Sequence, residues 1–109
     1  MRTESLDFEL VDVSKAGPLA RDVTARVTNV SGGPLDDVRV ALLVAAGDRK
    51  VAEFAANLGD LDPGETRSMN RTISASPGEA FSLKANGADL HLVARIADRV
   101  ERAQGTLSF

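Results

Sequence analysis

Alternation of apolar and polar residues runs through most of this chain, interrupted at short intervals by glycine, proline and aspartate. This pattern is typical of short antiparallel strands joined by tight turns, each strand having one face in a core and one in solvent. It is clearest between residues 22 and 73. We therefore expect an all-β fold, built as a small antiparallel β-sandwich.

The alternation predicts about seven strands. The expected ranges are Ser5–Val13, Arg21–Val30, Val38–Ala46, Val51–Ala56, Thr66–Ser74, Leu90–Ile96 and Val100–Phe109. In the fifth strand, Arg71 has the same parity as the apolar residues Met69 and Ile73. Either that strand lies at the edge of a sheet or its register differs from the one assumed.

Segments rich in glycine, proline and aspartate are expected to be the turns. They are residues 14–18, 31–34, 47–50 and 58–65, with a tight turn at 98–99. Pro63 and Gly64 fit the two central positions of a type II turn, where glycine adopts a positive φ at no steric cost.

One short helix is predicted near residues 77–86. Ser76 would be its N-cap, Pro77 its first residue and Glu79 the partner that completes a capping box. Gly87 would end the helix in the left-handed conformation. An irregular loop is the alternative for this segment.

Composition limits the class of protein. With 109 residues and 43% hydrophobic residues, we expect one domain over residues 1–109 with a packed core. Four Phe and no Trp or Tyr leave few anchors for stacking sugars or bases. The net charge of −3, with interspersed signs, argues against a nucleic-acid partner.

The chain contains no cysteine, so disulfides, zinc thiolates and a thiol nucleophile are excluded. Residues 1–7 contain no apolar signal-peptide region, and no run approaches the roughly 20 apolar residues that span a bilayer. We expect no direct membrane insertion. The chain is either a cytoplasmic protein or a domain from a longer exported chain.

Three segments together carry a family signature. They are Val27-Thr28-Asn29-Val30-Ser31, residues 35–40, and the run Leu-Gly-Asp-Leu-Asp-Pro-Gly-Glu-Thr at residues 58–66. The chain resembles the immunoglobulin-like repeats of prokaryotic surface proteins, of the cell-adhesion-related (CARDB) and FxLYD types. The resemblance covers about the middle half of the chain. It implies a seven-stranded immunoglobulin-like sandwich that is not an enzyme and that spaces or displays other domains. The aromatic residue often found on the third strand of those repeats is absent here.

The third expected strand is apolar on both faces, because Ala41, Leu43 and Ala45 follow Arg39 on its outward side. If the third and sixth strands are neighbours, as in immunoglobulin-like sandwiches, a patch forms outside the sheet. This candidate face consists of Arg39, Ala41, Leu43, His91, Val93 and Arg95. Either the segment 76–87 covers it, or it is an interface for a protein partner or a second copy.

Other candidate chemistry has simpler interpretations. His91 is the single histidine, so one chain cannot form a multi-histidine site, and a solvent-exposed side chain is the simpler interpretation. Asp60, Asp62 and Glu65 could hold calcium, but acidic residues are also ordinary in turns.

Two sequences, Asn29-Val30-Ser31 and Asn70-Arg71-Thr72, fit the N-glycosylation sequon. They favour an exported context, although chance is a comparable explanation. Asn29 could instead cap the following turn.

Together these observations predict a non-catalytic structural or protein-interaction module that needs no cofactor and no metal. The alternative is a stand-alone cytoplasmic homodimer, or an accessory subunit of a larger complex. We predict a protein partner or homo-oligomer in either case.

Overall fold

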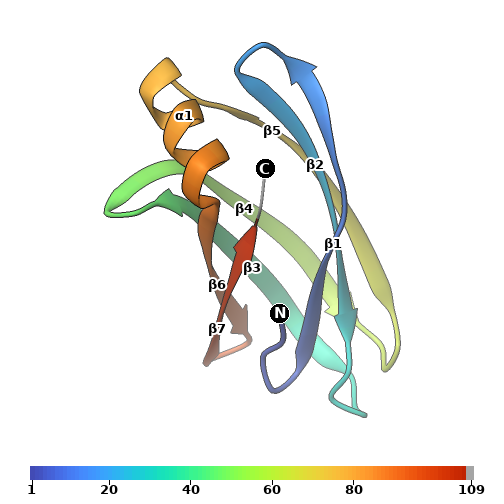
Figure 1. The fold of residues 1–109 in the computed structure, drawn as a ribbon. Helices are drawn as coiled ribbons and strands as arrows, with labels where there is room; N and C mark the ends of the chain where they lie inside the picture. Colours follow the sequence, from blue (N-terminus) through green and yellow to red (C-terminus); the bar gives the residue numbers. More distant parts are fainter. Residues whose placement is uncertain (108–109) are drawn as a thin grey trace.

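The computed structural model describes residues 1–107, apart from the side chains of residues 80–82 and 84. Over these residues seven strands and one helix follow one another along the chain (Figure 1). They are β1 (Leu6–Gly17), β2 (Ala20–Asn29), β3 (Leu35–Ala46), β4 (Arg49–Leu61), β5 (Thr66–Ser74), α1 (Pro77–Asn86), β6 (Ala88–Ile96) and β7 (Arg99–Leu107).

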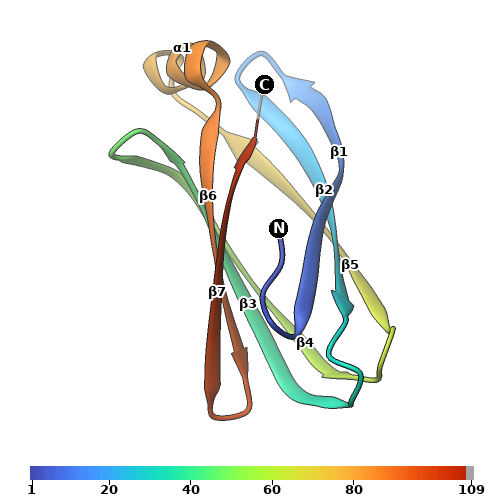
Figure 2. The ribbon, with the colours of Figure 1, turned by 60° about the horizontal axis from the view of Figure 1, so that its bottom comes forward.

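The strands form two antiparallel sheets that pack face to face (Figures 1 and 2). One sheet has the order β1-β2-β5, and the other has the order β4-β3-β6-β7. The expected all-β sandwich of about seven strands and one short helix is therefore confirmed.

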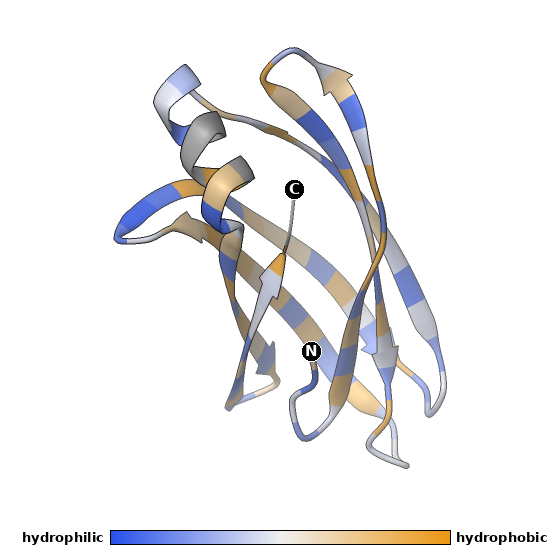
Figure 3. Ribbon diagram, in the orientation of Figure 1, coloured by the Kyte–Doolittle hydropathy of each residue, from blue (hydrophilic) through white to orange (hydrophobic). Residues whose placement is uncertain are grey.

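The core lies between the sheets. In β1, β2 and β6 the buried apolar residues share one parity, and hydrophobic and hydrophilic colours alternate along strands in Figure 3. The largest fully buried side chains of the core include Leu6, Phe8 and Val27 from one sheet and Val38, Leu61 and Leu92 from the other. Apart from Phe8 these are aliphatic, as the composition requires.

The first strand is longer than predicted. β1 continues through residues 14–17 and turns at Pro18 and Leu19, where Gly17 pairs with Ala20. The prediction that residues 14–18 end the strand is wrong. The register shifts between Leu10 and Asp12, and this bulge breaks the period of two on which the prediction depended.

The fourth strand is also longer than its predicted range of 51–56. It includes Arg49 and Lys50, so the hairpin turn is confined to Gly47 and Asp48. It also extends to Leu61, which is fully buried. A register shift around Val38 and Gly59, with φ of 68° at Gly59, lets the strand continue where the glycine suggested a turn.

The remaining turn of that segment has the predicted geometry. Gly64 has a φ of 78°, and the backbone N–H of Glu65 donates to the carbonyl of Asp62 at 2.9 Å. Pro63 and Gly64 are thus the central residues of a type II turn. Gly32, with a φ of 83°, lies in the turn expected at residues 31–34.

At the other end of the chain, the β6–β7 turn lies at Ala97 and Asp98, one residue earlier than predicted. β7 is described to Leu107, and the predicted extension to residue 109 lies outside the described residues. β5 is the edge strand of its sheet, and Arg71 is exposed there. The edge position therefore explains why a charged residue, Arg71, can occupy the same side of the strand as Met69 and Ile73.

The helix begins as predicted. The Ser76 hydroxyl accepts from the Glu79 backbone N–H at 3.3 Å, and the Glu79 carboxylate accepts from the Ser76 N–H at 2.9 Å. Gly87 ends it with φ of 73° but ψ of −171°, so the predicted left-handed helical conformation is wrong in ψ. Leu83 is buried in the core, and α1 lies at one end of the sandwich (Figures 1 and 2).

Candidate functional site

The candidate face lies on the outer side of the four-stranded sheet. β3 and β6 are neighbours, and their register pairs Arg39 with Arg95, Ala41 with Val93 and Leu43 with His91. Because residues two apart on a strand share a face, all six predicted residues lie together. They alternate with the buried residues of the same strands, so they point away from the core.

The helix does not cover this face. Ala41, Leu43, His91 and Val93 keep part of their surface exposed, and both arginines are exposed. Segment 76–87 instead lies at one end of the sandwich and places Leu83 in the core. Of the two alternatives, covering by this segment is therefore wrong.

Residues from the outer strands of the sheet extend the candidate face. On β4, Ala55 pairs with Ala41 and Asn57 pairs with Arg39. On β7, Arg102 pairs with Val93. Sequence reasoning missed these three. The alternation of residues in β4 indicates that Ala55 and Asn57 point outward. Only the order of strands in the sheet shows that they lie beside Ala41 and Arg39.

A shallow groove of about 410 Å³ lies in the part of the candidate face around Arg39 and Arg95, and Leu43 and His91 are outside its lining. Its lining comes from β4, β3 and β6 and includes Arg39, Ala41, Ala55, Asn57, Val93 and Arg95. The floor is formed by small side chains, because alanine and valine stand where larger residues would fill the space. This shape admits a side chain or an edge of another molecule.

The charge of the groove is uneven. Arg39 and Arg95 face each other across the β3–β6 pair, which is unfavourable for like charges. Arg39 has an exposed ion pair with Asp37 at 3.3 Å. Among ion pairs within residues 1–107, none includes Arg95 or Arg102. The groove therefore presents guanidinium groups beside an apolar floor.

The outer side of the three-stranded sheet is different, because its side chains bond to one another. The hydroxyls of Thr28 and Thr66 share a hydrogen bond at 2.9 Å. Asn70 Nδ2 donates to Thr24 Oγ1 at 2.9 Å, and the Thr72 hydroxyl donates to Asp22 at 2.6 Å. We call Asp22, Thr24, Thr28, Thr66, Asn70 and Thr72 the hydroxyl face. It offers no comparable apolar surface.

Two of the acidic residues considered for calcium, Asp60 and Glu65, accept hydrogen bonds from backbone N–H groups. Asp60 accepts from the Asp37 backbone N–H at 3.0 Å. Glu65 accepts from the Asp62 N–H and pairs with Arg67 at 2.6 Å, and these contacts hold the pKa of the Glu65 carboxyl below its ordinary value. Within the described part of the chain, no three potential metal ligands converge.

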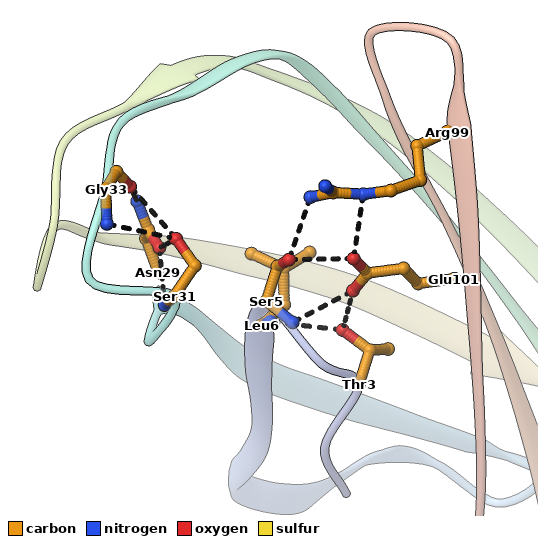
Figure 4. Close-up of polar contacts among 8 residues, drawn as sticks. All are labelled: Thr3, Ser5, Leu6, Asn29, Ser31, Gly33, Arg99 and Glu101. Atoms are coloured by element: carbon orange, nitrogen blue, oxygen red, sulfur yellow. Dashed lines mark hydrogen bonds and ion pairs between the residues drawn. The ribbon is translucent and has the colours of Figure 1, made fainter.

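Glu101 is a buried carboxylate that sequence reasoning missed. It accepts from the Thr3 hydroxyl at 2.6 Å and from the hydroxyl and N–H of Ser5 at 2.7 and 2.9 Å (Figure 4). Arg99 lies 3.1 Å from the same carboxylate. Burial raises the pKa of Glu101, but the hydrogen bonds and Arg99 outweigh it and lower the pKa overall.

No sequence signal identifies this cluster. Thr3 and Ser5 are more than 90 residues from Glu101 along the chain, and the hydropathy pattern of β7 suggests the opposite orientation. Val100 is exposed there and Glu101 is buried. All accepting oxygens of Glu101 are engaged with the protein, which makes it a structural group.

No helix in the described part of the chain is both long and apolar enough to cross a membrane.

Two facing antiparallel sheets of three and four strands define an immunoglobulin-like β-sandwich domain. The chain belongs to the archaeal immunoglobulin-like domain family, whose model matches residues 7–109. The expected prokaryotic immunoglobulin-like class is therefore confirmed. The match does not support the finer resemblance to CARDB-type or FxLYD-type repeats. No curated protein matches the chain in sequence.

Solved structures resemble this fold at low sequence identity. The putative ApaA protein from Bordetella pertussis is 14% identical with a TM-score of 0.57, and the match covers 95% of this chain and 93% of that one. A β-glucuronidase from Bacteroides uniformis is 12% identical with a TM-score of 0.57. That match covers 96% of this chain but 13% of the enzyme. Both similarities concern the fold alone.

Proposed function

We propose that this domain is a non-catalytic interaction module that binds an acidic surface of another protein through the candidate face. The observation that carries the proposal is the contrast between the two outer faces. One presents small apolar side chains beside arginines, whereas the side chains of the other bond among themselves. Membership of the archaeal immunoglobulin-like domain family is compatible with a role in spacing or displaying neighbouring domains.

Charge complementarity supports an acidic partner. Carboxylates placed between Arg39 and Arg95 would accept from two guanidinium groups and relieve their mutual repulsion. Larger apolar residues of the partner would fill the groove above Ala41, Ala55 and Val93. Arginine is also enriched among residues that dominate binding energy at interfaces.

A second copy of the chain fits this face less well. If two copies met with their Arg39–Arg95 rows opposed, like charges would be brought together. Light scattering over a concentration series decides this point. We expect the mass to remain near 11.5 kDa, and a concentration-dependent dimer that Leu43→Asp dissociates would instead identify the partner as a second copy.

The binding test uses a synthetic peptide of alternating glutamate and leucine, followed by backbone amide chemical shifts. We expect shifts at Ala41, Val93 and Arg95 that weaken as salt is added. Arg95→Glu should raise the Kd by about tenfold or more. Arg26→Glu, an exposed arginine on the other sheet, is the matched control and should leave binding unchanged.

Shifts confined to the hydroxyl face, or equal effects of the two charge reversals, would contradict the proposal. Leu43→Asp checks the face itself, since a half-exposed position should tolerate the change without unfolding.

A further inference from the structure

The two N-glycosylation sequons lie in very different environments. Asn29 is 1% exposed, and both hydrogens of its side-chain amide are donated in hydrogen bonds. They go to the carbonyls of Gly33 at 2.8 Å and Leu61 at 3.0 Å. Its Oδ1 accepts from the backbone and hydroxyl of Ser31 (Figure 4). Asn29 therefore caps its turn, and a glycan on its nitrogen would displace a buried hydrogen bond.

Asn70 has the opposite environment. It is exposed on β5, which is the edge strand of the three-stranded sheet. Its Nδ2 makes one hydrogen bond to a side chain, to Thr24 Oγ1 at 2.9 Å. Because an amide nitrogen carries two hydrogens, one can be replaced while the other continues to donate to Thr24.

The rest of the sequon is also accessible. Thr72 lies two residues further along the strand, so its hydroxyl is on the same face as the Asn70 amide. It is exposed and contacts Asp22 at the surface. Arg71 between them is not proline, as a sequon requires.

From this geometry we propose that Asn70 is an N-glycan acceptor when the domain is exported, and that Asn29 is not. The donor is a sugar carried on a lipid pyrophosphate. A bond forms between Nδ2 and the anomeric carbon, and the bond from that carbon to the pyrophosphate oxygen breaks. The amide loses one proton, the lipid pyrophosphate leaves, and no oxidant or reductant is needed.

The position of Asn70 is compatible with the proposed binding activity. A glycan there would project from the hydroxyl face, whose neighbouring side chains are polar and can hydrogen-bond to sugar hydroxyls. The candidate face is on the other sheet. Glycosylation would therefore leave the groove open while it shields the opposite side of the domain.

The test is secretion of the chain, behind a signal peptide, from a eukaryotic host that N-glycosylates proteins. Intact mass and peptide mapping should show one glycan, at Asn70, that a peptide N-glycosidase releases. Asn70→Gln and Thr72→Ala should each abolish the added mass. Thr66→Ala removes a neighbouring hydroxyl outside the sequon, and Ser31→Ala destroys the other sequon. Both variants should keep the glycan.

An unmodified Asn70 in a preparation whose co-secreted reporter sequon is occupied would overturn the proposal. A glycan mapped to Asn29 in folded protein would also overturn it. The melting transition of the glycosylated wild type should match that of Asn70→Gln, and loss of that transition on modification would show that the site is incompatible with the fold.

Discussion

Gly64 shows how one residue determines a turn. Its φ of 78° lies in a region that β-branched residues avoid, and no neighbouring atom would obstruct a Cβ there. The requirement for glycine is therefore one of backbone conformation. The dipeptide Pro63-Gly64 carries this information locally, which explains why the type II turn could be predicted from the sequence.

We expect Gly64→Val to lower the free energy of unfolding by about 1 kcal/mol or more, because valine must adopt a positive φ. Urea denaturation measures this change. Gly33→Ala is the matched control, since Gly33 lies in another turn without a positive φ and also has open space around it. Equal stability of Gly64→Val and wild type would contradict the turn assignment.

The carboxylates near that turn lead to a second expectation. Asp60 and Glu65 already accept hydrogen bonds from backbone N–H groups, and Glu65 also pairs with Arg67. Calcium would compete with these donors for the negative charge of the carboxylates. We therefore expect millimolar calcium to leave the melting temperature unchanged, whereas a rise that saturates with calcium would identify a site.

At the scale of single elements, the sequence predicted which segments are strands better than where they end. The alternation identifies the middle of each strand because one face is buried. It fails at β1 and β4, where bulges near Val11 and Gly59 shift the register and the strand continues beyond the break. A bulge is stabilised by the partner strand, so the local sequence does not reveal it.

The helix is the element whose start was predicted most directly, since its capping box is a local motif. Ser76→Ala removes the acceptor for the Glu79 N–H and should lower stability by about 1 kcal/mol. Thermal or urea denaturation measures the loss. Ser74→Ala, an exposed serine at the end of β5, should have little effect. If Ser76→Ala and Ser74→Ala have equal free energies of unfolding, the cap contributes nothing measurable to stability.

At the scale of the whole molecule, the candidate face could be predicted in part. The alternation of residues along β3 and β6 predicted which of them point outward, and the assumption that these strands are neighbours proved correct. The contributions of Ala55, Asn57 and Arg102 depend on the order of all four strands, which pairwise patterns do not determine. The long-range cluster around Glu101 could not be predicted, since its partners lie near the other end of the chain.

Glu101 joins the two sheets, because it belongs to β7 and binds the segment that leads into β1. Its pKa is lower in the folded protein than in the unfolded chain, so the unfolded state binds more protons in acid. The stabilisation is therefore complete above the unfolded pKa of about 4.3 and is lost as the pH falls through the lower folded value.

We expect Glu101→Gln to cost about 2 kcal/mol near neutral pH, because an amide N–H would face the donors of Thr3 and Ser5. We would measure the free energy of unfolding by urea denaturation from neutral pH to about pH 3. The difference in this free energy between the wild type and the variant should shrink in acid. Glu53→Gln, the control, removes a surface carboxylate paired with Lys50, and its free energy of unfolding should change with pH in parallel with that of the wild type. If the Glu101→Gln curve also runs parallel to the wild type across this range, the ionised carboxylate does not hold the sheets together, and the packing between them must do so alone.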